Sequence, residues 1–170
     1  MVILGIDPGF GRLGYGIIDY TNNKYKVLEC GCITTEADSN FPDRLEKIEE
    51  DLQSVVSRYK IDAASIEELF FNTNITTGIK VAEARGVILC TLKKANIKIF
   101  EYTPLEIKQA ITGFGRAKKT QVMDMVKSTL KLQKMPKLDD TADALAMCIC
   151  HASTHKYEDY VEKYGGKNAK

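Results

Sequence analysis

The sequence predicts an α/β fold in which a mixed β-sheet carries helices on both faces. Three apolar segments rich in β-branched residues open the chain at residues 2–7, 14–20 and 24–34, and turn-forming residues separate them. Short connections of this kind predict an antiparallel meander. Segments with helical spacing then alternate with two short strand-like segments, so the expected order is β-β-β-α-β-α-β-α-α-α. This alternation is typical of a sheet that is covered on both sides.

Periodicity and capping signals define the remaining elements. The expected helices are 42–59, 75–95, a short helix from 103, 118–132 and 139–154, and the expected strands are 62–67 and 97–102. The short helix begins with Thr103, Pro104 and Glu106, which are the N-cap, the first-turn proline and the N3 glutamate of a capping box. Pro136 separates the last two helices.

Length and composition indicate one domain. The 170 residues, 44% of them hydrophobic, suffice for a single core, which we place at residues 1–155. We expect residues 156–170, which include two adjacent glycines, to form a frayed tail. No segment approaches the roughly eighteen apolar residues of a membrane-spanning helix. The opening MVILGIDPG lacks the basic region of a signal peptide, so we expect a cytoplasmic protein that does not enter a membrane.

The five cysteines predict reduced, mostly buried thiols in such a compartment. Cys30 and Cys32 share one face of a strand, which we expect to be a core face. Cys148 and Cys150 lie close to two histidines, which invites a zinc site. On a helix, however, these two cysteines point about 200° apart and cannot both reach one ion. We therefore expect both to be buried thiols.

Charge is distributed unevenly along the chain. The net charge is only +1, yet residues 108–137 contain eight basic residues and a single acid, Asp124. The basic residues are Lys108, Arg116, Lys118, Lys119, Lys127, Lys131, Lys134 and Lys137. Such a run can simply be a solvated face, but in a nearly neutral protein it also suits binding to phosphates.

Four carboxylates occupy positions that suit metal-assisted phosphoryl transfer, which requires acids from distant parts of the chain to converge on hard cations. Asp7 ends the first strand and Glu67 ends the fourth. Asp140 and Asp143 are three residues apart, so on a helix they project from one face about 60° apart. Each also has an ordinary structural interpretation, as a turn former, a cap or a partner of the helix dipole. The positions of these acids alone do not distinguish a metal-binding site from these structural roles.

The motifs around these acids resemble those of the RuvC family of crossover (Holliday) junction endodeoxyribonucleases over about residues 1–155. The matching segments are ILGIDPGFGRLGYGII at the start, Ser65–Phe70, Ala84–Gly86, Lys108-Gln109, Gly113–Lys119 and Asp139–Ala146. Each segment is weak evidence alone, but their shared order and spacing are specific. The resemblance implies an RNase H-like nuclease domain with a five-stranded mixed sheet.

The resemblance also implies the roles of individual residues. It assigns catalysis and metal binding to Asp7, Glu67, Asp140 and Asp143, choosing Glu67 over Glu68 and Asp140 over Asp139. Lys119 would stabilise phosphate charge during catalysis, and Lys108, Arg116, Lys118 and Lys119 would contact DNA. Phe70 would stack on unpaired bases at the junction centre.

The implied activity is Mg²⁺-dependent resolution of four-way DNA junctions by paired, symmetric nicks, in recombination and repair. Two Mg²⁺ ions would be held per site, with Mn²⁺ able to substitute. The implied partners are a second copy of the chain in a homodimer and the RuvA–RuvB branch-migration complex.

Two other functions remain open on the residues alone. One is a broader nuclease of the same fold that cleaves RNA–DNA hybrids, and the other is a non-catalytic module that binds nucleic acid through its basic segment. The presence of all four acids argues against the second. The Gly-x-Gly-x-x-Gly pattern at residues 9–14 does not indicate a dinucleotide site, because a strand rather than a helix is expected after it.

Overall fold

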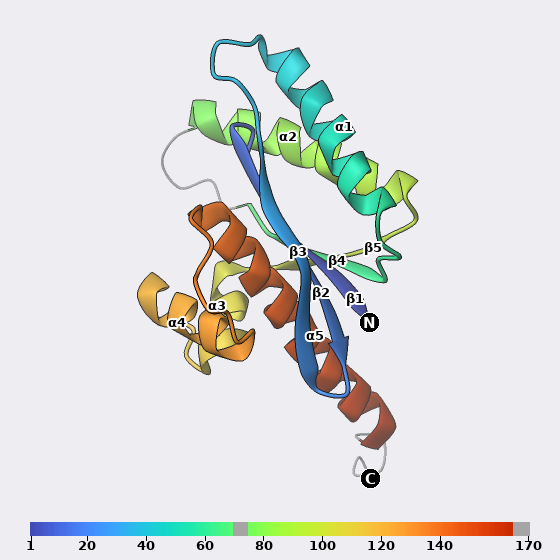
Figure 1. Ribbon diagram of the computed structural model, residues 1–170, viewed down its shortest axis with the longest axis vertical. Coiled ribbons are helices and arrows are strands. Elements are labelled where there is room, and N and C mark those ends of the chain that lie inside the picture. The colour runs from blue at the N-terminus through green and yellow to red at the C-terminus, as the bar shows by residue number, and fades with distance from the viewer. Residues whose placement is uncertain (70–74, 165–170) are drawn as a thin grey trace.

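The computed structural model describes residues 1–69 and 75–164, with only the backbone described from residue 156 onward. Its sheet has the order β3-β2-β1-β4-β5 (Figure 1). The strands are β1 (Val2–Asp7), β2 (Arg12–Thr21), β3 (Lys24–Thr34), β4 (Ala63–Glu67) and β5 (Lys98–Tyr102). The first three form the predicted antiparallel meander, while β4 runs parallel to β1 and β5 runs parallel to β4. The predicted mixed five-stranded sheet is confirmed.

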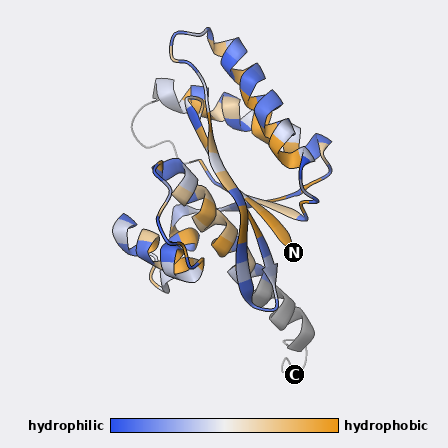
Figure 2. Ribbon diagram, viewed as in Figure 1, coloured by the Kyte–Doolittle hydropathy of each residue, from blue (hydrophilic) through white to orange (hydrophobic). Residues whose placement is uncertain are grey.

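Helices cover both faces of this sheet, as predicted. They are α1 (Phe41–Ser57), α2 (Ile75–Lys94), α3 (Pro104–Thr112), α4 (Lys119–Thr129) and α5 (Asp139–Tyr164). In Figure 1, α1 and α2 lie on one side of the sheet and α3, α4 and α5 on the other. The buried side chains accordingly form two clusters, and successive residues of β1 alternate between them: Ile3 packs with α5, and Leu4 packs with α1 and α2. Figure 2 shows the resulting concentration of hydrophobic residues on β1.

Two helix ends differ from the prediction. Helix α4 ends at Thr129 rather than near 132, because Lys131 has a left-handed backbone conformation with φ of 52°. Helix α5 continues to Tyr164 instead of ending near 154, so the first part of the expected frayed tail is helical. Residues 155–164 contain neither glycine nor proline, and nothing in their sequence stops the helix before Gly165.

Helix α5 lies directly on the backbone of β1 and β2 because glycines face it. A Cβ atom on Gly14 would lie 1.9 Å from the carbonyl oxygen of Asp140, and one on Gly5 would lie 2.0 Å from that of Ala144. Any larger residue at these two positions would push the helix away from the sheet. We call Gly5 and Gly14 the glycine bed. It sets the distance between α5 and the strand that ends in Asp7.

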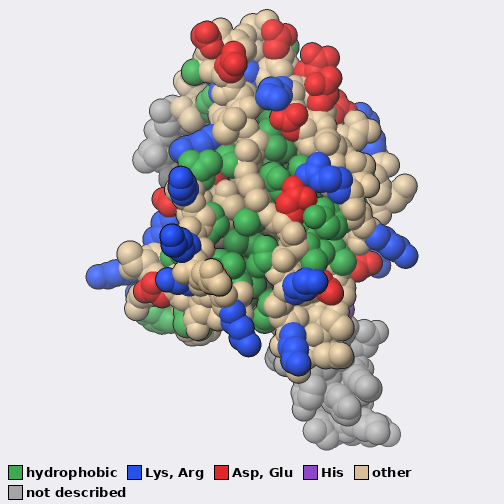
Figure 3. Space-filling model, in the orientation of Figure 1, with side chains coloured by type: hydrophobic (Ala, Val, Ile, Leu, Met, Phe, Trp, Pro, Cys, Tyr) green, Lys and Arg blue, Asp and Glu red, His purple; other side chains and the backbone are tan. Residues whose placement is uncertain are grey.

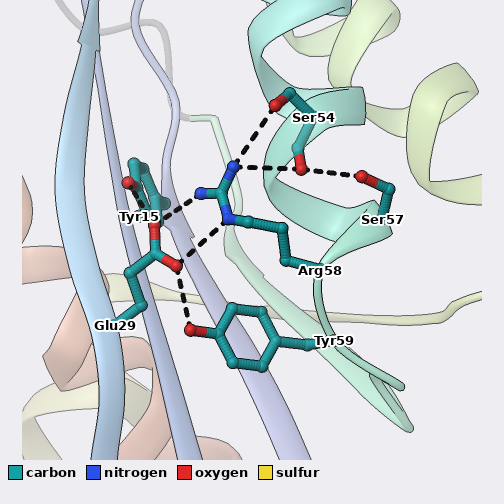
Figure 4. A network of polar contacts seen from close by, with 6 residues as sticks. All are labelled: Tyr15, Glu29, Ser54, Ser57, Arg58 and Tyr59. Carbon is teal, nitrogen blue, oxygen red and sulfur yellow. Dashed lines mark hydrogen bonds and ion pairs between the residues drawn. The ribbon is translucent and has the colours of Figure 1, made fainter.

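A polar network anchors the end of α1 to the edge strand β3 (Figure 4). The carboxylate of Glu29 accepts hydrogen bonds from Arg58, from the hydroxyl of Tyr15 at 2.9 Å and from that of Tyr59 at 3.0 Å. The hydrogen bond from Arg58 is the main reason that the pKa of Glu29 is lowered. The network therefore holds α1 in place over the sheet.

The prediction of mostly buried cysteines is wrong for three of the five. Cys148 and Cys150 are buried, as expected, but Cys30 and Cys90 are exposed and Cys32 is only partly buried. Cys30 and Cys32 do lie on the face of the sheet that α5 covers, opposite Gly16 and Gly14 of β2. However, β3 is the edge strand and α5 lies mainly over β1 and β2, so the core does not extend to these thiols.

Candidate active site

Two acids meet at one end of the sheet because of its topology. Asp7 and Glu67 are the last residues of β1 and β4, which are adjacent and parallel, with Ile6 opposite Ile66. The C-terminal ends of neighbouring parallel strands lie at the same edge, so the two carboxylates emerge side by side.

Helix α5 brings the other two acids to the same edge. Gly14 is directly opposite Asp7 in the antiparallel pair of β1 and β2, and the carbonyl group of Asp140 rests on Gly14. The first turn of α5 is thereby held beside the end of β1. Asp143 follows three residues after Asp140 on the same helix face.

A cavity of about 280 Å³ opens at this edge. Its polar lining consists of Asp7, Glu67, Asp143, Lys108 and Lys119, and its apolar lining comes from α3, α4 and α5. The cavity thus combines three of the four predicted carboxylates with two of the predicted basic residues. Asp140 does not line it and lies on the opposite side of Asp7, toward Arg12.

The carboxylates are close enough to perturb one another. The pKa of Asp7 is raised from 3.8 to about 7, first by burial and then by the negative charges of Asp143, Glu67 and Asp140, with Lys119 opposing the shift. The pKa of Glu67 is raised as well, by burial and by Asp143. An acidic cluster of this kind favours either protons or added cations.

Lys119 forms an ion pair with one of these carboxylates, that of Asp143. Its Nζ atom donates a hydrogen bond to Oδ2 of Asp143 at 3.0 Å and lies 3.4 Å from Oδ2 of Asp139. The lysine is the first residue of α4, so this contact joins the start of α4 to the start of α5. The hydrogen bond to Asp143 is the main reason that the pKa of Lys119 is raised.

Arg12 lies beside Asp140, much as Lys119 lies beside Asp143. Its Nε atom lies 3.4 Å from Oδ2 of Asp140, but that buried oxygen accepts no hydrogen bond. The contact is therefore one of charge rather than a formed hydrogen bond. Asp140 retains an unsatisfied buried acceptor, which a bound cation would satisfy. Within the two described stretches, no three acidic, histidine or cysteine side chains are yet arranged to enclose a metal ion, and two of the acids are instead paired with basic side chains.

The structure places the remaining predicted residues as follows. Glu68 lies outside the cavity and lines a separate one with Arg85 and Glu101, so Glu67 is the glutamate beside Asp7. Arg116 and Lys118 are exposed between α3 and α4 and do not line the cavity. Phe70, the predicted stacking residue, lies outside the described residues.

Sequence reasoning did not find Arg12 as a site residue. The only signal was a basic residue shortly after the Asp7 turn, within a glycine pattern that we interpreted as a hairpin. Its proximity to Asp140 depends on how α5 crosses the hairpin, which no local pattern specifies.

An RNase H-like mixed sheet with acids from two strand ends and one helix defines the class of protein as a nuclease that acts on phosphodiesters. The model of the family described as "Crossover junction endodeoxyribonuclease RuvC" matches residues 3–151. The chain belongs to the RuvC family, and this membership confirms the predicted enzyme class.

The similarity extends over nearly the whole chain. The crossover junction endodeoxyribonuclease RuvC of Clostridioides difficile is 49% identical over 98% of this chain and 99% of its own length. The structure of Thermus thermophilus RuvC in complex with a Holliday junction substrate is 31% identical, covers 93% of this chain and 96% of its own, and superposes with a TM-score of 0.88. A second structure of the Thermus thermophilus protein gives a TM-score of 0.87.

Proposed function

We propose that this chain is a metal-dependent endonuclease that resolves Holliday junctions by paired, symmetric nicks in DNA recombination and repair. The observation that carries the proposal is the cavity in which Asp7, Glu67 and Asp143 face Lys108 and Lys119. Acids that can hold cations and bases that can hold phosphate are the two requirements of phosphodiester hydrolysis. The relatives named above act on crossover junctions, which gives the substrate class.

The acidic cluster fits hard divalent cations. The unsatisfied oxygen of Asp140 and the raised pKa of Asp7 would both be relieved by added positive charge. We infer that Asp7, Glu67, Asp140 and Asp143 hold two Mg²⁺ ions, with Mn²⁺ able to substitute. Bound Mg²⁺ supplies polarisation of the scissile phosphate and a more acidic attacking water.

The basic residues divide into two groups by position. Lys119 and Lys108 line the cavity and would donate hydrogen bonds to the oxygens of the scissile phosphate, Lys119 leaving Asp143 to do so. Arg116 and Lys118 are exposed outside the cavity and would contact phosphates farther along the strand. Figure 3 shows acidic side chains gathered over α1, whereas basic side chains are spread over the rest of this face, including that of α3 and α4. The low density of acids around α3 and α4, together with the lysines at the cavity, favours approach of DNA from that side.

The roles that we propose for Phe70, for a second copy of the chain and for the RuvA–RuvB complex rest on family resemblance. Phe70 would stack on bases that are unpaired at the crossover. Symmetric nicks require two sites, and one chain supplies one, so we infer a homodimer. The RuvA–RuvB complex would deliver the junction, and we infer that the enzyme would act in the cytoplasm, where such DNA lies. No described helix is long and apolar enough to cross a membrane.

A substrate comparison tests the proposed function. The protein is incubated with Mg²⁺ and a synthetic four-way junction, a nicked duplex or an RNA–DNA hybrid of matched length. We expect paired nicks in the junction and little cleavage of the other two. Preferential cleavage of the hybrid would instead establish a ribonuclease, and binding of the junction without cleavage of any substrate would establish a binding module.

A further inference from the structure

Arg12 lies on the side of the carboxylate cluster that faces away from the cavity. In the sheet, β1 has β4 on one side and β2 on the other. Glu67 ends β4 and faces the cavity with Lys108, whereas Arg12 begins β2 and lies beside Asp140. Basic side chains therefore flank Asp7 from both sides, but only those of α3 and α4 belong to the cavity.

The contact between Arg12 and Asp140 leaves the arginine available. The side chain of Arg12 is 58% exposed, its closest approach to Asp140 is 3.4 Å, and no hydrogen bond satisfies the carboxylate oxygen. A contact at this distance, with no hydrogen bond and with its arginine mostly exposed to solvent, contributes little to stability. Its position, by contrast, is well defined, because Gly14, two residues along β2, supports the backbone of Asp140. The arginine is thus held close to the reaction centre at little energetic cost.

We propose that Arg12 is a phosphate-binding residue for the DNA backbone on the β2 side of the site, held by Asp140 in the free protein and released when divalent cations bind Asp140. The inference rests on the proposed function. A DNA strand whose scissile phosphate lies over Asp7, between the lysines of α3 and α4, must leave the cavity on some side. Arg12 is a basic residue on the β2 side. A guanidinium group suits this task, since it can donate to two phosphate oxygens at once.

The first experiment measures junction binding in Ca²⁺ as a function of salt concentration, for the wild-type protein, Arg12→Ala, Arg12→Lys and Lys24→Ala. Lys24 is the matched control, because it is an exposed basic residue at the far end of the hairpin formed by β2 and β3. We expect Arg12→Ala to reduce the slope of log affinity against log salt by about one. Arg12→Lys and Lys24→Ala should keep the wild-type slope, and all four proteins should melt at similar temperatures. A wild-type slope for Arg12→Ala would overturn the proposal.

The second experiment measures Mn²⁺ binding to the free protein by calorimetry. If Arg12 and the cation share Asp140, Arg12→Ala should bind Mn²⁺ more tightly, by roughly twofold to fivefold for loss of an exposed opposing charge. Equal or weaker binding would contradict the shared use of Asp140. Failure of the proposed function is distinguishable, since the wild-type protein would then show no preference for the junction.

Discussion

Lys119 donates a hydrogen bond to Asp143 across 24 residues of sequence, with Nζ 3.0 Å from Oδ2. The bond connects the basic segment of the chain with its last pair of acids. In the free protein the lysine pairs with a proposed metal ligand and lines the cavity together with Asp7 and Glu67. The contact therefore supports the proposal that Lys119 acts on the scissile phosphate.

Replacement of Lys119 should affect chemistry far more than stability. Lys119→Ala removes an exposed ion pair, so we expect a loss of less than about 1 kcal/mol in the free energy of unfolding. The single-turnover cleavage rate at saturating junction should fall by about 10²–10³-fold, as for loss of one donor to a developing charge. Lys127→Ala, an exposed lysine on the same helix, is the control. An equal effect in both variants would assign Lys119 to general DNA binding.

Removal of the Asp7 charge should separate binding from cleavage. Asp7→Asn retains the shape of the side chain but removes a proposed metal-binding charge, so we expect no detectable cleavage and near wild-type junction binding. Glu68→Gln is the matched control, because Glu68 is the adjacent acid outside the cavity. Gel-shift and cleavage assays on the same preparations measure both properties. Near-normal cleavage by Asp7→Asn would exclude Asp7 from the site.

Because the pKa of Asp7 is raised, we expect the stability of the metal-free protein to depend on pH. The folded protein holds this proton up to about pH 7, whereas the unfolded chain releases it near 3.8, so the contribution of Asp7 to stability falls as pH rises between these values. His151 acts in the opposite direction, because burial lowers its pKa to about 4. The difference between wild type and Asp7→Asn isolates the Asp7 contribution.

We therefore expect Asp7→Asn in a chelator to be more stable than wild type at pH 8, and the difference to shrink toward zero near pH 4. Urea denaturation at a series of pH values measures it. A difference that is constant with pH would show that the carboxylate is not perturbed. Addition of Mg²⁺ should stabilise wild type more than Asp7→Asn, since only wild type offers all four carboxylates.

The glycine bed should tolerate no side chain. Gly14→Ala places a Cβ atom 1.9 Å from the carbonyl oxygen of Asp140, so either α5 moves or the chain unfolds. We expect a loss of several kcal/mol in stability and the loss of cleavage. Gly86→Ala is the control, because no atom lies within 4 Å of the added Cβ and alanine favours the helix by up to about 1 kcal/mol. Thermal melting distinguishes the two, and a wild-type melting temperature for Gly14→Ala would contradict the close contact.

The elements of this fold could be predicted because their signals are local. Alternation defines the strands, helical spacing and caps define the helices, and parallel strand ends bring Asp7 and Glu67 together. The exposure of Cys30 could not be predicted, because the edge position of β3 follows from pairing between distant strands. The pairing of Arg12 with Asp140 likewise depends on how α5 crosses β2, and the assignment of Glu67 over Glu68 came from family resemblance rather than from periodicity.

The contact between α5 and the glycine bed also has a consequence for how this enzyme can change. The separation of Asp140 from Asp7 is determined by main-chain atoms in direct contact, whereas the cluster of hydrophobic side chains on the α1 and α2 side of the sheet contributes no residue to the lining of the cavity. Substitutions among those side chains can alter heat tolerance while leaving the spacing of the acids unchanged. Adaptation to a new growth temperature can therefore proceed through the core without retuning the chemistry, and directed evolution for thermostability should begin there.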